Sequence, residues 1–176
     1  MNAQTNRKQL IHILQMAYSG EKAAALAYAG HWRAVRKVEE RKAIWQIEQD
    51  EWEHRAMILP MLHALDAQPQ AWRELMMGTI GSIIFLACFI SGWFFPMYFA
   101  GRLEHANVHE YVEAAELARA IQRSDYEAIL LRLSLVEQSH EDYFKERVTG
   151  HCLTPIMKQL FHWGPETQIV TNTADI

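Results

Sequence analysis

Apolar residues recur at every third or fourth position along almost the whole of this chain. Such a repeat places apolar side chains along one face of an α-helix, and only eight Gly and five Pro interrupt the 176 residues. The pattern predicts long helices at about 9–33, 39–65, 94–121 and 124–149, with a short amphipathic segment at 153–163. We expect Pro60 to kink the second helix and Ser124 to cap the fourth, and we leave a break of the third at Pro96 open. The fold class is therefore all-α.

Composition indicates one folded domain. The apolar fraction of 50% excludes a disordered chain, and the length fits a single unit, taken as residues 1–165 before a polar tail at 166–176. Because 17 basic residues face 21 acidic ones, a general nucleic-acid partner is not expected. The polar N-terminus lacks a signal-peptide core, which argues against export, and Cys88 and Cys152 are expected to be reduced, buried thiols of a cytoplasmic protein.

Acidic residues interrupt the helical apolar stripes in a regular way. Glu51 and His54, and likewise Glu137 and His140, form Glu-x-x-His pairs, whose spacing puts carboxylate and imidazole on one helix face. A di-iron carboxylate bundle needs two such pairs plus one Glu from each of two other helices, and Glu21 is centred on the first helix. The alternative is a polar core in which these groups satisfy one another, but it would bury four acids against two imidazoles, so metal is the simpler neutraliser.

An internal repeat selects Glu104 as the fourth carboxylate. Glu21 precedes Tyr28 by seven residues, and Glu104 precedes Tyr111 by the same seven. Each half thus reads Glu-x6-Tyr, a hairpin and Glu-x-x-His, which is the two-fold pseudo-symmetry that a two-metal site built from two helical hairpins would produce. Glu110 also fits an apolar stripe and remains the alternative ligand, with Glu113 a weaker candidate. Tyr28 and Tyr111 are the candidate catalytic residues, as donors that orient ligands or substrate, unless they are ordinary core tyrosines. The remaining histidines are expected at the surface or in packing: His12, His31, His63, His105, His109, His151 and His162.

The segment 75–101 has no charged residue over 27 positions. A run of that length can span a bilayer, can be core, or can form two short helical pieces, broken near Gly92, that lie in a membrane interface. We favour the interfacial interpretation because aromatic side chains prefer the headgroup zone. These aromatic residues are Trp93, Phe94, Phe95, Tyr98 and Phe99.

The stretch Tyr-Ser-Gly-Glu21-Lys-Ala-Ala-Ala-Leu-Ala-Tyr28-Ala-Gly resembles the first ligand helix of the demethoxyubiquinone hydroxylases. The resemblance covers roughly residues 10–147 and includes both Glu-x-x-His pairs, Asp142 and the run His109-Glu110-Tyr111. It implies a ferritin-like four-helix bundle with additional interfacial segments. The iron ligands that it implies are Glu21, Glu51, His54, Glu104, Glu137 and His140.

The resemblance further implies a monooxygenase that uses O2 and two iron ions to hydroxylate a quinone or a related lipid or aromatic ring, as in ubiquinone biosynthesis. An external reductant such as NADH would supply electrons, and manganese in place of one iron stays open. The enzyme would lie peripherally on the inner face of the membrane, and it could form homo-oligomers. The alternatives are a ferritin-like iron-handling or peroxide-reducing protein and a membrane-binding helical protein with a vestigial site.

Overall fold

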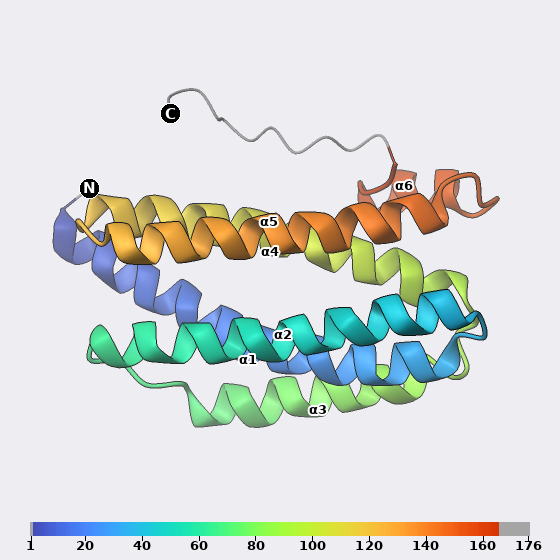
Figure 1. Cartoon of the computed structure of the whole chain (residues 1–176), viewed down its shortest axis with the longest axis horizontal. Coiled ribbons are helices and arrows are strands. Elements are labelled where there is room, and N and C mark those ends of the chain that lie inside the picture. The colour runs from blue at the N-terminus through green and yellow to red at the C-terminus, as the bar shows by residue number, and fades with distance from the viewer. Residues whose placement is uncertain (1, 166–176) are drawn as a thin grey trace.

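The computed structural model describes residues 2–165, and in this range the chain is all-helical with six helices and no strand. Figure 1 shows the long helices running nearly along one direction, with α3 along one side and the short α6 at one end. The helices are α1 (Ala3–Ala34), α2 (Val38–Ala64), α3 (Ala71–Ala87), α4 (Phe94–Ala120), α5 (Ser124–Val148) and α6 (Thr154–Phe161).

Helix α1 begins earlier than the apolar pattern predicts. The Asn2 side chain caps the helix by accepting a hydrogen bond from the Gln4 amide at 2.7 Å, as an N-cap asparagine commonly does. One turn later the Arg7 guanidinium donates to the Leu65 carbonyl at 2.6 Å and so joins the first turns of α1 to the end of α2. The polar N-terminal residues are therefore helical, contrary to the expected start near residue 9.

The break left open at Pro96 does not occur, and the expected cap of the fourth long helix differs from the prediction. Helix α2 continues through Pro60 to Ala64, and Pro96 does not interrupt α4 because it lies in the first turn, where a missing amide proton costs no helical hydrogen bond. Ser124 is the first residue of α5 rather than its cap. Arg123 holds the cap position without a side-chain hydrogen bond.

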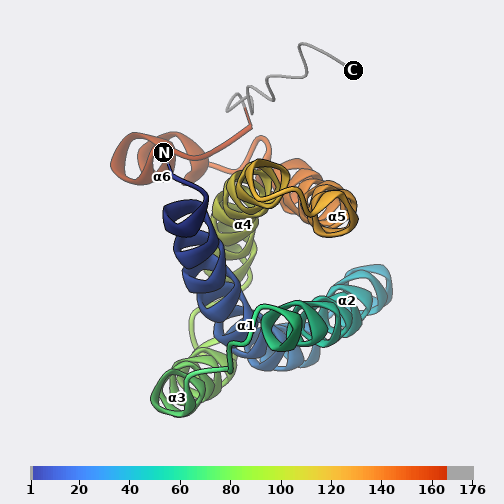
Figure 2. The same cartoon turned by 90° about the vertical axis from the view of Figure 1, so that its left-hand side faces the viewer.

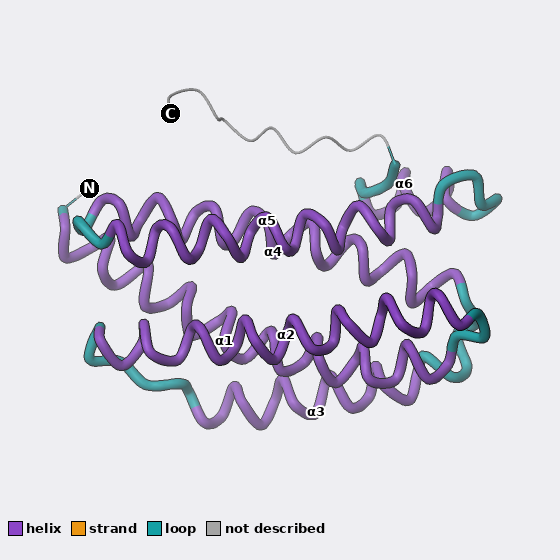
Figure 3. Tube along the Cα trace, in the orientation of Figure 1, coloured by secondary structure: helices purple, strands orange, loops and turns teal. Residues whose placement is uncertain are grey.

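The helices pair as two hairpins, α1 with α2 and α4 with α5, and the hairpins meet mainly where α1 packs on α4. Figure 2 looks along the helices and shows α1 at the centre, between α2, α3 and α4. The tube in Figure 3 shows the short loops that join successive helices. Two buried apolar clusters fill the interior at opposite ends, one around Leu10 and Leu130 and one around Tyr28 and Phe144. We call them the Leu10 cluster and the Phe144 cluster.

The uncharged segment forms α3, a turn and the start of α4. The expected break near Gly92 is confirmed, since Gly92 adopts φ +77° in the turn between these helices. The first part is one continuous helix that packs on α1 and exposes apolar residues on its outer side, among them Leu75, Ile83 and Leu86. In the described range, no helix combines the length and apolar character that crossing a membrane requires.

The aromatic cluster of this segment does not lie on one surface. Phe94 and Tyr98 are buried in the Phe144 cluster, whereas Phe95 and Phe99 are exposed. The expectation that all five aromatic residues face an interface is therefore wrong for Phe94 and Tyr98. A helix that both enters the bundle and borders the surface has to divide its aromatic residues between its two faces.

The C-terminal part folds back onto α4. The Tyr98 hydroxyl donates to the Trp163 carbonyl at 2.6 Å, and the Trp163 indole lies on Gly101, where a Cβ would come within 2.2 Å of the ring. Cys88 is buried as expected, but Cys152 is exposed, so the expectation of two buried thiols is wrong for Cys152. The polar tail expected at 166–176 lies outside the described residues.

Candidate metal centre

Each of the four long helices carries its acidic or imidazole residues midway along its length. On α1, Glu21 lies between residues of the Leu10 cluster and residues of the Phe144 cluster, and the same holds for Glu51 and His54 on α2. On α4 and α5 the corresponding positions are Glu104, Glu137 and His140. Because apolar layers close both ends, all six side chains are buried between them, with at most 4% of any one exposed.

The six side chains form two overlapping sets of donor atoms. One set comprises Glu21, Glu51, His54 and Glu137, and the other comprises Glu51, Glu104, Glu137 and His140; within each set the donor atoms lie within 4.8 Å of one another. Glu51 and Glu137 belong to both sets. Two carboxylates shared between two sets of ligands are the arrangement that bridges a pair of metal ions, so the cluster could hold two ions.

The donor atoms of this cluster lack the partners that buried polar atoms normally have. Both carboxylate oxygens of Glu51 and of Glu137 have no hydrogen-bond partner among the described residues. The same is true of one Glu21 oxygen and of Nδ1 in both His54 and His140. His54 Nδ1 does lie 2.9 Å from Glu137 Oε1, but the pair lacks hydrogen-bond alignment. Since leaving buried polar groups unpaired is costly, these atoms fit cations as their missing partners.

The two tyrosines of the internal repeat connect the halves crosswise. The Tyr28 hydroxyl on α1 donates to Glu104 on α4, and the Tyr111 hydroxyl on α4 donates to Glu21 on α1. Each tyrosine thus holds the carboxylate of the opposite half, and both hydroxyls are buried beside the cluster. This placement fits a role in orienting ligands, while catalysis by these hydroxyls stays a prediction.

Two further residues hold the ligands in place. Asp50 Oδ2 lies 3.1 Å from His140 Nε2, which leaves Nδ1 of that imidazole facing the cluster, and the Asn107 amide donates to Glu104 Oε2 at 3.1 Å. Asp50 flanks the first Glu-x-x-His pair, but its partner lies 90 residues away, so sequence alone cannot assign it. Asn107 was missed, and its position one turn after Glu104 is the signal that points to it.

The pKa shifts of the six side chains indicate how their charges are compensated when no cation is bound. Burial raises the pKa of Glu51 and of Glu104 well above the usual carboxyl range, and the charge of Glu137 adds to both shifts. Burial would also raise the pKa of Glu137, but the adjacent imidazoles of His140 and His54 outweigh it and lower that pKa. Burial opposes charge on His140, yet Asp50 and Glu137 raise its pKa to about 9. Retained protons therefore keep the metal-free cluster near neutrality, and metal ions would displace them.

Glu110 is not part of either donor set. It is partly buried on the wall of a cavity of about 260 Å³ between α1, α3 and α4, and burial followed by the charge of Glu21 raises its pKa to about 7. The same wall contains Glu21 and Tyr111, whereas the rest is mostly apolar. The cavity therefore reaches from the candidate metal ligands to the inner side of α3.

The other histidines lie outside the cluster. His31 is buried in the Phe144 cluster region, stacked against Tyr28 and Phe144, and His105 Nδ1 lies 3.1 Å from Glu141. His151 stacks on Phe94, and His12 and His63 are exposed. These positions agree with the expectation of surface or packing histidines.

Comparisons of this chain with models of protein families, with curated proteins and with solved structures find no match. The resemblance to the demethoxyubiquinone hydroxylases therefore rests on the quoted residues alone. The structure shows an all-helical fold with a buried set of glutamates and histidines that could hold metal ions.

Proposed function

We propose that this chain is a ferritin-like di-iron carboxylate enzyme that uses O2 to hydroxylate a quinone or a related lipid-soluble ring. The observation that carries the proposal is the pair of donor sets that share Glu51 and Glu137. Four carboxylates and two imidazoles at these positions match the ligand requirement of di-iron bundles. Four carboxylate charges also balance two Fe(II) ions, so the loaded site would be neutral when reduced.

The chemistry that iron supplies is the activation of O2 with two electrons, and the protein provides ligands, orientation and a dry cavity. The overall balance is one ring C–H, O2, two electrons and two protons giving one ring C–OH and water, with an external donor such as NADH as the electron source. In this scheme Tyr28 and Tyr111 hold Glu104 and Glu21 in position, and Asp50 holds the His140 ring. The apolar clusters at both ends keep bulk water from the cluster.

The 260 Å³ cavity is the proposed substrate site. Apolar residues of α1, α3 and α4 form most of its wall, and Glu21 and Tyr111 place the metal ligands at its inner end. A flat, apolar ring with few polar groups suits such a wall, since ligand sites are mostly apolar with a small number of placed polar groups. Besides Glu21, the wall carries Arg73 and Glu110, which would face the polar substituents of the ring.

The exposed apolar side of α3 is the proposed membrane contact. The inner side of the same helix covers the cavity, so a lipid-soluble substrate would pass from the bilayer to the cluster without entering water. In aqueous solution an apolar surface of this kind drives association, so homo-oligomers or detergent dependence are expected. The protein would then be a peripheral one on the inner, cytoplasmic face of the membrane.

The test begins with metal content. Anaerobically loaded wild type should retain about two iron ions per chain, as di-iron bundles do, and Glu51→Ala and His140→Ala should lose most of them. Metal analysis also distinguishes two iron ions from one iron with one manganese. Iron stoichiometry that is unchanged in both variants would refute the site.

The second step tests the reaction. The iron-loaded protein is incubated with NADH, ¹⁸O2 and a demethoxyubiquinone analogue with a short isoprenoid tail, and the product is examined by mass spectrometry. Incorporation of one ¹⁸O atom, absent with Glu51→Ala, supports the hydroxylase. A protein that binds iron but instead consumes hydrogen peroxide, or mineralises iron, without oxidising the quinone is the iron-handling or peroxide-reducing alternative.

A further inference from the structure

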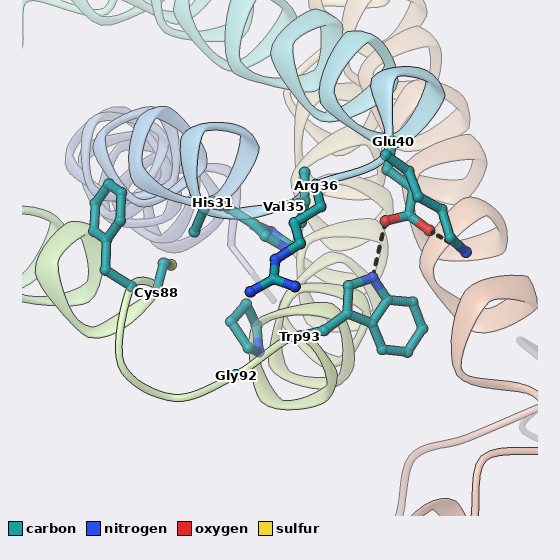
Figure 4. Close-up of a pocket in the computed structure, with 11 residues that line it drawn as sticks. His31, Val35, Arg36, Glu40, Cys88, Gly92 and Trp93 are labelled. Carbon is teal, nitrogen blue, oxygen red and sulfur yellow. Dashed lines mark hydrogen bonds and ion pairs between the residues drawn. The ribbon is translucent and has the colours of Figure 1, made fainter.

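A pocket of about 530 Å³ lies at the end of the molecule where α1 turns into α2, apart from the metal cluster and its cavity. The end of α1, the first turn of α2 and the turn between α3 and α4 form its wall, as Figure 4 shows. Its polar wall residues are His31, Arg36, Lys37, Glu40 and Trp93. None of them takes part in the proposed di-iron chemistry.

Arg36 supplies a positive charge that nothing in this pocket offsets. Its side chain is exposed, and among the described residues no hydrogen bond or ion pair joins it to a partner. Figure 4 shows its guanidinium reaching into the pocket above Gly92. A free guanidinium at a pocket is suited to an anion such as phosphate, which it can bind with two parallel hydrogen bonds.

The acidic residue of the pocket is already neutralised. Glu40 accepts a hydrogen bond from the Trp93 indole at 2.9 Å, and Lys37 Nζ lies 3.2 Å from its other oxygen. Figure 4 shows both interactions on the side of the pocket away from Cys88. Since the charge of Lys37 offsets that of Glu40, the charge of Arg36 makes the electrostatic potential in the pocket positive.

A buried imidazole nitrogen without a partner also borders the pocket. His31 is 2% exposed, and no described residue hydrogen-bonds to its Nε2 atom. In Figure 4 the imidazole extends from α1 toward Arg36. Helix α2 begins at the same place without a side-chain cap, so its positive N-terminal end adds to the field that favours an anion.

The surface around the pocket points to a lipid rather than to a soluble anion. Phe89 lines the pocket, and the neighbouring Ile90 is 88% exposed. The chain carries a net charge of -4, yet residues 33–42 hold five cations against two acids. All five are exposed: Arg33, Arg36, Lys37, Arg41 and Lys42. Basic side chains next to exposed apolar ones are typical of surfaces that contact anionic lipids.

We propose that this pocket binds the phosphate headgroup of an anionic phospholipid in a bilayer. Arg36 holds the phosphate with help from His31 Nε2, while the acyl chains lie along Phe89, Ile90 and the exposed side of α3. The inference rests on the membrane contact that the proposed function assigns to α3. It specifies in addition which lipid headgroup is bound and which end of the molecule faces the bilayer. It does not depend on the identity of the metal ions or of the substrate.

The test compares two vesicle compositions with a matched pair of variants. Iron-loaded full-length protein is floated with vesicles of phosphatidylcholine and with vesicles of equal parts phosphatidylcholine and phosphatidylglycerol. We compare wild type with Arg36→Gln and with the control Arg132→Gln, which removes the same charge from an exposed position on α5. Arg36→Gln should lower partitioning to the mixed vesicles about fivefold, the effect of one cation at an anionic surface. Arg132→Gln should leave it unchanged, and neither variant should affect the weaker binding to phosphatidylcholine.

Each other outcome overturns the proposal in a distinguishable way. Equal binding to both vesicle types would mean that the apolar side of α3 acts alone, and equal losses in both variants would mean a diffuse charge effect. Calorimetric binding of inorganic phosphate as tight as that of the mixed vesicles would assign the pocket to a soluble anion. Absence of binding to either vesicle would refute the membrane contact itself, while the iron stoichiometry would still test the metal centre separately.

Discussion

Glu104 and Glu110 lie on the same helix, and the structure separates them clearly. Glu104 is completely buried, accepts a hydrogen bond from Tyr28 and belongs to a donor set. Glu110 lies on the cavity wall, where it belongs to no donor set among the described residues. The difference follows from helical geometry, because six residues turn a side chain by about 240° around the axis.

We therefore expect Glu104→Ala to lose at least half of the bound iron and Glu110→Ala to keep nearly all of it. The physical reason is that a metal ion deprived of one carboxylate keeps too few ligands and too little compensating charge. Metal analysis of the two purified variants makes the comparison, and each serves as the control of the other. The opposite result, with iron lost only in Glu110→Ala, would make Glu110 the ligand.

The buried His31 side chain should make the stability of the protein depend on pH. Burial lowers its pKa to about 3, against 6.5 for the free side chain, so between these values the unfolded chain binds a proton that the folded protein does not. Stability due to His31 is therefore lost as the pH falls below about 6.5. At pH 5 the loss amounts to about 2 kcal/mol, from 1.5 pH units at about 1.4 kcal/mol each.

Replacing His31 by Phe keeps an aromatic ring beside Tyr28 and Phe144 and removes the titration. Urea unfolding at pH 7.5 and at pH 5, at equal ionic strength, should show a smaller loss of unfolding free energy in His31→Phe than in wild type. The constant effect of the substitution on packing cancels in the difference between the two pH values. Equal losses in both proteins would mean that His31 is protonated in the folded state.

Residues of the site divide into those that sequence can predict and those that it cannot. The six candidate ligands follow from fixed spacings along single helices, and the structure brings all six together. The hydrogen bond between Asp50 and His140, and the crossed bonds of Tyr28 and Tyr111, join different helices. They depend on how each helix is rotated against its neighbour, which a one-dimensional pattern does not contain.

Among the helices, the limits of α2, α4 and α5 can be predicted from the sequence, whereas the orientation of α3 cannot. Helices α2 and α5, and α4 after Gly101, alternate apolar and charged residues, so their periodicity sets their limits to within a few residues. Helix α3 carries charges only in its first turn, at Arg73 and Glu74, so no charged face marks the orientation of the rest, and only packing decides which side is covered. The start of α1 was misjudged because its first residues are polar and are tied down by Arg7 reaching Leu65.

Helix α3 packs against α1 through a close approach at Gly81. A Cβ there would lie 2.7 Å from the Ala23 carbonyl oxygen and 2.8 Å from the Ala23 Cα. Because both atoms belong to the backbone, Gly81→Ala should push α3 from α1 and destabilise the protein by about 1–3 kcal/mol, the usual range for overpacking. Thermal unfolding measures the effect, and hydrogen exchange should show faster exchange along α3.

The control is Gly78→Ala on the same helix. A Cβ at Gly78 meets first the Lys22 Cε atom at 3.1 Å, which belongs to a flexible side chain. Here the gain in helix propensity, about 0.5–1 kcal/mol, should make the variant as stable as wild type or slightly more stable. Equal destabilisation by both substitutions would show that α3 does not depend on the contact at Gly81.

The whole molecule consists of two hairpins whose internal contacts are more extensive than the contacts between them. Each hairpin supplies three of the six candidate ligands, and each donor set contains residues of both hairpins. In the metal-free state four buried carboxylates and two imidazoles must lie together at this junction. Metal ions would therefore act as a link between halves that otherwise meet around a costly cluster of polar atoms.

From this arrangement we expect metal to stabilise the entire fold, not only the ligands. Fe(II) added without oxygen at about a hundred times its dissociation constant should contribute about 2.7 kcal/mol, which corresponds to a rise in Tm of roughly 5–10 °C for a domain of this size. Amides near the ligands on α2 and α5 should show the largest fall in hydrogen exchange, because these two helices have the fewest direct contacts across the junction. The double variant Glu51→Ala, His140→Ala is the control, since it removes a shared carboxylate and an imidazole. If iron raises its Tm as much as that of wild type, the stabilising ions bind elsewhere and do not link the hairpins.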